Sequence, residues 1–88
     1  MRILWDDEKN RKLISERGVG FEEVVSCIMN NEVLDVLKNP TRIGQYNLIV
    51  HLKNYTYAVP FLVNENEEVI LKTIYPSRKL HKLYGRKK

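Results

Sequence analysis

Residues 45–63 read QYNLIVHLKNYTYAVPFLV, and this stretch decides the fold class. Apolar or aromatic side chains occupy every second position from Tyr46 to Leu52, and the same period returns from Tyr55 to Val63. A period of two is typical of a β-strand, whose side chains alternate between the two faces of a sheet. Lys53-Asn54 separates the two runs and is typical of a tight two-residue turn. The stretch therefore predicts an antiparallel hairpin.

The segments around this hairpin extend the sheet. Pro60 interrupts the second strand and indicates an edge position or a bulge, because proline cannot donate to a sheet ladder. Residues 64–67 predict a turn, and residues 68–75 predict a third strand. Residues 2–5 predict a short strand or an extended arm, and residues 33–37 form a short apolar run before the next break.

Three helices are predicted. The first follows the capping residues Asp6-Asp7 and runs to about Arg17, where a glycine ends it. The last is short and basic, is capped by Ser77, and runs to about Tyr84. The second has apolar residues at the spacing of one helical face. These residues are Phe21, Val24, Val25, Ile28 and Met29.

The order of these elements predicts an α+β fold. Two N-terminal helices pack on one face of an antiparallel meander of three to four strands, and a short basic helix follows. Eighty-eight residues make a single domain, residues 1–88, with one shared core. The opposite face of the sheet is left open for cover or for use.

The charge of the chain is strongly asymmetric. No acidic residue follows Glu68, so the eight other Lys and Arg residues stand against all eleven acidic residues in the first part. A local positive field selects polyanionic partners, and nearby aromatic and histidine side chains favour nucleic acid. The seven cations of the last part are Lys72, Arg78, Lys79, Lys82, Arg86, Lys87 and Lys88.

Several classes of protein are disfavoured. Cys27 is the single cysteine, so an internal disulfide and a structural zinc cluster are excluded, and it is expected to be a small buried helix residue. No signal peptide, membrane-spanning run, glycine-rich phosphate loop or metal-ligand spacing is present. We therefore expect a cytoplasmic protein that needs no cofactor, binds no metal and does not enter a membrane.

The basic segment contains four candidate phosphate contacts. Lys72 is expected in mid-strand, on the same pleat face as Ile70 and Ile74, where it is either a solvated lysine or a phosphate clamp. Arg78 stands at the start of the last helix, where a planar guanidinium can hold phosphate oxygens. The neighbouring Lys79 and Lys82 either position an RNA backbone or simply form a solvated basic helix.

Proton-transfer and stacking candidates lie in the same segment. His81 is the only histidine expected near the basic cluster, where it acts as a general acid or base or is a bystander. His51 is expected to be exposed or satisfied on the sheet. Tyr75 and Tyr84 either stack on bases or pack at the rim of the core. Cations beside one proton-transfer group can supply much of what metal-independent RNA cleavage by the 2′-hydroxyl requires.

Two motifs resemble those of BrnT-type toxins. The first is Trp5-Asp6-x-x-Lys9 followed by RGVGFEE at residues 17–23, which is similar to the family's W-D-x-x-K and H-G-V-S-F-E-E. The second is LKTI at residues 71–74 followed by Ser77-Arg78-Lys79, which is similar to the family's closing R-I-I-S-A-R-K segment. The resemblance covers nearly the whole chain in order.

The resemblance implies a RelE-like fold and a ribonuclease toxin of a type II toxin–antitoxin system that inhibits translation. It also implies neutralisation by a small DNA-binding antitoxin, through which the toxin can oligomerise. Lys72 stands where the family has a strand arginine, and Arg78 and Tyr84 match a second functional arginine and a tail tyrosine. The chain departs from the family at Arg17, usually histidine, and at Gly20, usually a capping serine.

We therefore expect a metal-independent endoribonuclease. The alternative is a non-catalytic RNA-binding or protein-interaction module that uses the same basic surface. Which residue is the general base stays open. The expected catalytic residues are Lys72, Arg78, His81 and Tyr84, and the expected RNA-binding residues are Lys79, Lys82, Tyr75 and Arg86.

Overall fold

Six strands form one sheet in residues 2–85, the part of the chain that the computed structural model describes. β3 (Gln45–Leu52) and β4 (Tyr55–Val63) lie at its centre, and β2 (Asp35–Lys38) pairs with the outer side of β3. The strands that complete the sheet are β5 (Val69–Leu71) and β6 (Tyr75–Pro76), which both pair with β4, and β1 (Ile3–Leu4), which pairs in parallel with β5.

The α+β class is confirmed, but the expected number of strands was too low. The apolar run around residues 33–37 contributes to β2, and the N-terminal segment contributes β1. The central hairpin has the predicted ends, with Leu52 opposite Tyr55. Lys53 and Asn54 both have positive φ, 52° and 65°, as a two-residue turn that matches the twist of the strands requires.

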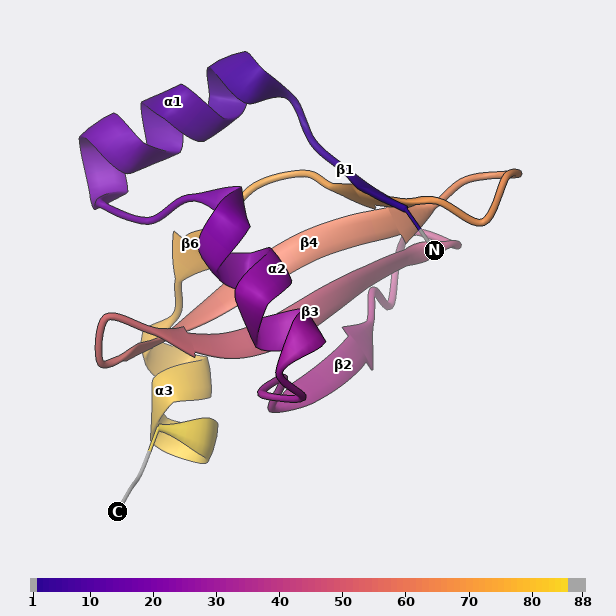
Figure 1. The fold of residues 1–88 in the computed structure, drawn as a ribbon. Coiled ribbons are helices and arrows are strands. Elements are labelled where there is room, and N and C mark those ends of the chain that lie inside the picture. Colours follow the sequence, from indigo (N-terminus) through magenta and orange to yellow (C-terminus); the bar gives the residue numbers. More distant parts are fainter. Residues whose placement is uncertain (1, 86–88) are drawn as a thin grey trace.

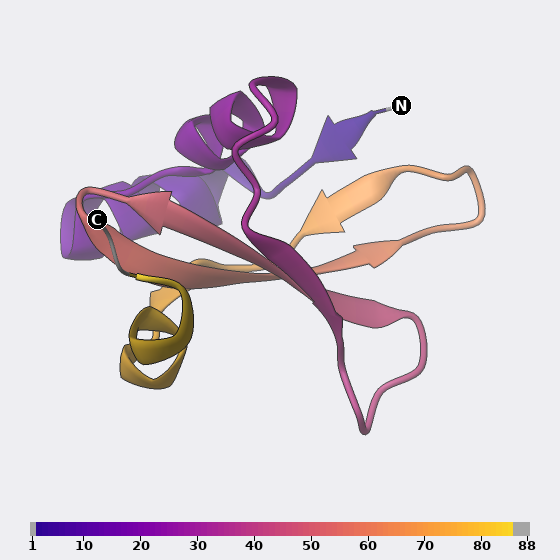
Figure 2. The same ribbon diagram turned by 90° about the horizontal axis from the view of Figure 1, so that it is seen from below.

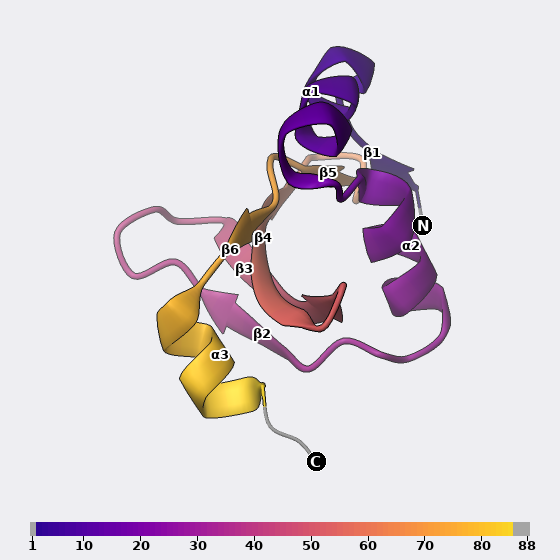
Figure 3. The same cartoon turned by 90° about the vertical axis from the view of Figure 1, so that its left-hand side faces the viewer.

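The helices lie on both faces of the sheet. α1 (Asp7–Arg17) and α2 (Phe21–Met29) lie over one face, and α3 (Arg78–Tyr84) lies on the other (Figures 1, 2 and 3). All three run as predicted, with Asp6 and Ser77 as the side-chain caps of α1 and α3. The main core lies between α1, α2 and the sheet. Its buried residues are Leu13, Val19, Phe21, Val24, Cys27, Leu48, Val50, Leu52, Val59, Leu71 and Ile74.

A buried asparagine joins the two N-terminal helices. Asn10 accepts a 2.7 Å hydrogen bond from the backbone N–H of Phe21 and donates a 2.9 Å bond to Glu22. Asn10 therefore caps α2 in place of a side chain at Gly20. A Cβ at Gly20 would lie 2.9 Å from Ile14 and 3.1 Å from Asn10, which explains why glycine stands at this position. The bond from Asn10 also lowers the pKa of Glu22.

A bulge divides the last strand. Leu71 pairs with Phe61 and Tyr75 pairs with Ala58, so residues 72–74 oppose only two residues of β4. The carbonyl of Pro60 accepts a 2.8 Å bond from Lys72 N–H. In an antiparallel strand, the N–H and the C=O of one residue point to the same neighbouring strand. A residue at position 60 would therefore direct its N–H toward the bulge, and proline has no N–H that would be left unpaired there. The bulge at Pro60 is confirmed, whereas an edge position and an unbroken strand over residues 68–75 were wrong.

The bulge also changes where Lys72 lies. Lys72 follows the end of β5 and is not in mid-strand, which corrects the sequence prediction. Leu71 faces the main core, so alternation places Lys72 on the opposite face with Ile70. The extra residue then returns Ile74 to the core, where it is fully buried and does not share the face of Lys72. Arg17 from α1 donates a hydrogen bond to the Ile74 carbonyl.

Candidate functional site

Helix α3 crosses the sheet face opposite α1 and α2. At its start, Ser77 N–H donates a 3.1 Å bond to the carbonyl of Thr56 on β4. At its end, the Tyr84 hydroxyl donates a 2.7 Å bond to Asp35 on β2. Because β3 lies between β4 and β2, the helix spans three strands and covers Ile49 and Ala58, which are fully buried. The candidate site is the surface around this helix.

Four of the expected cations are exposed at this surface. Lys72, Arg78, Lys79 and Lys82 are all exposed, and none forms an ion pair with a carboxylate of the described part of the chain. The strand pairing sets the distance between these cations. Lys72 N–H bonds to the carbonyl of Pro60, and α3 begins beside Thr56, which lies roughly 13 Å further along β4. The cations therefore form a row rather than a point. We call these four residues the basic row.

Tyr75 lies within the basic row. It pairs with Ala58, so its ring is on the face of α3, between Lys72 and Arg78 along the chain, and it is 38% exposed. An exposed aromatic ring between cations can stack on a base while the cations hold phosphates. Arg86, the remaining expected RNA contact, lies outside the described residues.

His81 sits at the inner side of α3 in a small aromatic cluster. Its Nδ1 lies 2.9 Å from Oγ1 of Thr56, and its ring stacks on Tyr55 with centroids 4.1 Å apart and planes 18° apart. The ring of His51 lies 6.2 Å from that of His81. The prediction that His81 is the only histidine near the basic cluster was therefore wrong. We give the name imidazole cluster to the four residues His51, Tyr55, Thr56 and His81.

His51 lies on the sheet as expected, but its position beside His81 was not predicted. One signal was available, because the two-residue turn at Lys53-Asn54 sets the register in which His51 faces Thr56. The contact of both residues with α3 had no local signal. It depends on a helix that begins more than twenty residues later and crosses back over the hairpin.

Tyr84 is engaged within the fold. Its hydrogen bond to Asp35 is the main cause that raises the pKa of Tyr84, and the same bond, followed by that from Val36 N–H, lowers the pKa of Asp35. A tyrosine whose proton is held by a carboxylate is a weak proton donor toward a substrate. The structure thus gives Tyr84 an anchoring position at the end of α3, and its catalytic role stays a prediction.

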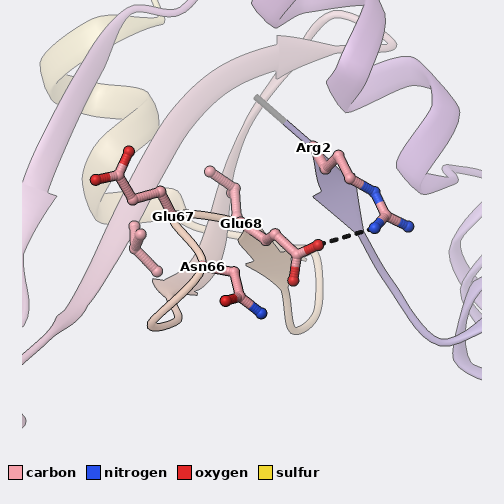
Figure 4. A pocket seen from close by; sticks show the side chains of 6 residues that line it. Arg2, Asn66, Glu67 and Glu68 are labelled. Carbon is pink, nitrogen blue, oxygen red and sulfur yellow. Dashed lines mark hydrogen bonds and ion pairs between the residues drawn. The ribbon is translucent and has the colours of Figure 1, made fainter.

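A separate hollow lies at the turn between β4 and β5 (Figure 4). It is lined by Arg2, Asn66, Glu67 and Glu68, and Arg2 is paired with Glu68 at 3.0 Å. Its carboxylates disfavour a phosphate, so we do not assign RNA to it. Residues 2–85 hold no group of three or more side chains suited to a metal ion, and no helix among them is long and apolar enough to cross a membrane.

Comparison with solved structures identifies the architecture. The crystal structure of the Brucella abortus ribonuclease toxin BrnT matches 88% of this chain and 96% of its own, with a TM-score of 0.62 and 20% sequence identity. The chain has the BrnT fold. This confirms the expected α+β architecture of the BrnT type. No protein-family model and no curated protein sequence matches the chain.

Proposed function

We propose that this protein is a metal-independent endoribonuclease, the toxin of a type II toxin–antitoxin pair. One observation carries the proposal. The exposed basic row lies beside the half-buried imidazole of His81, and the protein shares its fold with a ribonuclease toxin. A row of exposed cations suits a polyanionic chain, and an imidazole can both accept and donate a proton. RNA is the polyanion whose own 2′-hydroxyl can attack its backbone once it loses a proton.

Each part of the surface has a role in this proposal. Arg78 stabilises the negative charge that develops on the attacked phosphate, while Lys72, Lys79 and Lys82 hold the neighbouring backbone. His81 exchanges the proton in place of Tyr84, because the Tyr84 hydroxyl is held by Asp35. Cleavage of this kind inhibits translation by removing intact RNA from the cytoplasm.

The proposed inhibitor is a small DNA-binding antitoxin. Because the basic row carries no carboxylate partner within residues 2–85, an acidic segment of the antitoxin would gain charge pairs there and exclude RNA. We expect the complex to bind RNA more weakly than the free toxin. A purified complex that cleaves RNA as fast as the free protein would contradict this part of the proposal.

The test compares two arginine variants. Purified protein is incubated with end-labelled RNA in EDTA, as wild type, Arg78→Ala and Arg11→Ala. Both arginines are exposed, but Arg11 lies on α1, across the sheet from the basic row. We expect the wild type and Arg11→Ala to cut RNA and to arrest growth on expression. Arg78→Ala should lose about 100-fold in cleavage rate, as removal of one charge-stabilising group does. Undiminished cleavage by Arg78→Ala refutes the assignment.

The bond between Tyr84 and Asp35 supports one alternative function. With that hydroxyl engaged, the surface also fits a non-catalytic module that binds RNA or an acidic protein through the basic row. The same assay separates the two functions. RNA that is retarded on a gel but stays intact in the presence of the wild type supports the binding module.

A further inference from the structure

We propose that His51 is a second catalytic residue, which works with His81 as an acid–base pair, and that Thr56 positions His81. This inference rests on the proposed ribonuclease function and names the groups that move its protons. A protein with this surface and a single imidazole would have to reuse one group for two proton transfers. The structure supplies two imidazoles instead.

The fold brings the two rings to one place. His51 and Thr56 are directly opposite in the β3–β4 hairpin, so they share the face that α3 covers. His81 from α3 lies on Thr56, and its ring centroid is 6.2 Å from that of His51. Each hydrogen bond of about 2.8 Å would run from a ring nitrogen to a phosphodiester oxygen, and rings this close can both contact oxygens of one phosphodiester group. His51 is exposed and His81 is half-buried, so the site is open to a polymer.

Two imidazoles match the needs of RNA cleavage. One takes the proton from the 2′-hydroxyl as the 2′-oxygen forms its bond to phosphorus. The bond from phosphorus to the 5′-oxygen breaks, its electron pair leaves with that oxygen, and the other imidazolium donates a proton to it. The products are a 2′,3′-cyclic phosphate and a 5′-hydroxyl. One ring gains a proton and the other loses one, so no further reactant is needed.

Thr56 determines how His81 is presented. Its side chain is fully buried, and its hydroxyl lies 2.9 Å from Nδ1 of His81. This contact engages Nδ1 and leaves Nε2 as the nitrogen that exchanges a proton with RNA. Tyr55 stacks on the ring of His81 and restricts its rotation. Thr56 is therefore a positioning residue, which acts through His81.

The first experiment removes each imidazole. His51→Ala and His81→Ala are compared with Asn47→Ala. Asn47 also lies on β3, four residues before His51 and on the same face of the strand. We expect each histidine variant to lose about 100-fold or more in cleavage rate and to keep its RNA affinity, whereas Asn47→Ala stays as wild type. His51 is exposed, so its variant should keep the wild-type Tm. Wild-type cleavage by His51→Ala overturns the inference and leaves the proposed function standing. A wild-type protein that leaves RNA intact overturns both.

The second experiment assigns the acid. RNA in which sulfur replaces the bridging 5′-oxygen has a leaving group that needs no proton. Cleavage of this substrate should recover to near the wild-type rate in the variant that lacks the acid and stay slow in the variant that lacks the base. Recovery in neither variant overturns the acid–base pair.

For Thr56, we expect Thr56→Val to slow cleavage and Thr56→Ser to restore it. Equal rates in those two variants would show that Thr56 does not position His81.

Discussion

The hydroxyl of Tyr84 donates a 2.7 Å hydrogen bond to Oδ2 of Asp35, forty-nine residues earlier in the chain. The bond joins the last turn of α3 to the edge strand β2. It holds α3 across β3, and thereby holds His81 beside His51. The stability of the proposed site should therefore depend on this contact between residues that themselves touch no substrate in our proposal.

We expect Tyr84→Phe to lower Tm by a few degrees, within a pH range that is limited by the ionisation of Asp35 at low pH and of Tyr84 at high pH. The bond lowers the pKa of Asp35 below its ordinary 3.8, so the stability it contributes is present above pH 3.8 and is lost as the pH falls through the folded value. It raises the pKa of Tyr84 above 10.0, so that contribution is present below pH 10.0 and is lost as the pH rises further. Thermal melts across pH should show the largest difference between these limits.

The control for this prediction is Tyr75→Phe. Tyr75 is exposed, and its hydroxyl makes no hydrogen bond to the described residues. Its variant should melt with the wild type at every pH. A Tyr84→Phe difference that does not shrink at either end of the pH range would mean that the bond to Asp35 is not the cause.

Lys72→Ala should reduce the salt dependence of RNA binding. Each phosphate that a cation neutralises on single-stranded RNA contributes about −0.7 to the slope of log affinity against log salt concentration. Loss of Lys72 should make the slope shallower by about that amount. Lys12→Ala, an exposed lysine on α1, should leave it unchanged. Equal slopes for both variants would show that Lys72 does not neutralise an RNA phosphate.

Asn10→Ala should destabilise the protein by about 2 kcal/mol, because it leaves the N–H of Phe21 buried without its partner. Urea unfolding measures this free energy. The matched control is Asn66→Ala, an exposed turn residue, for which we expect a change within about 0.5 kcal/mol. Similar values for the two variants would show that Asn10 does not hold the helices together.

Cys27 should react slowly with thiol reagents in the folded protein. The side chain is buried, and this burial, followed by the charges of Glu32 and Glu23, raises the pKa of the thiol. Less thiolate and less access both slow the reaction. Labelling at pH 8 should proceed much faster in urea than in buffer. Equal rates under the two conditions would contradict the buried position.

Local patterns predicted the elements but not every strand. The apolar face of residues 21–29 and the alternation in residues 45–63 specify a helix and a hairpin through contacts close in sequence, and both have the predicted bounds. The short strands β1 and β2 carry too few residues for a pattern of their own. The bulge was indicated at Pro60, yet the register that sends Ile74 inward and leaves Lys72 outside depends on the paired strand.

The sequence by itself determined the helix and hairpin elements, the excess of cations after Glu68 and the resemblance to BrnT-type toxins, because caps, periodicity and charge are local properties of the chain. Tertiary structure alone decided that Tyr84 binds Asp35 and that His51 lies beside His81. Those contacts join β2, β3 and α3 across long separations in sequence. They follow from how one helix packs across a twisted sheet, and no short stretch of residues specifies that packing.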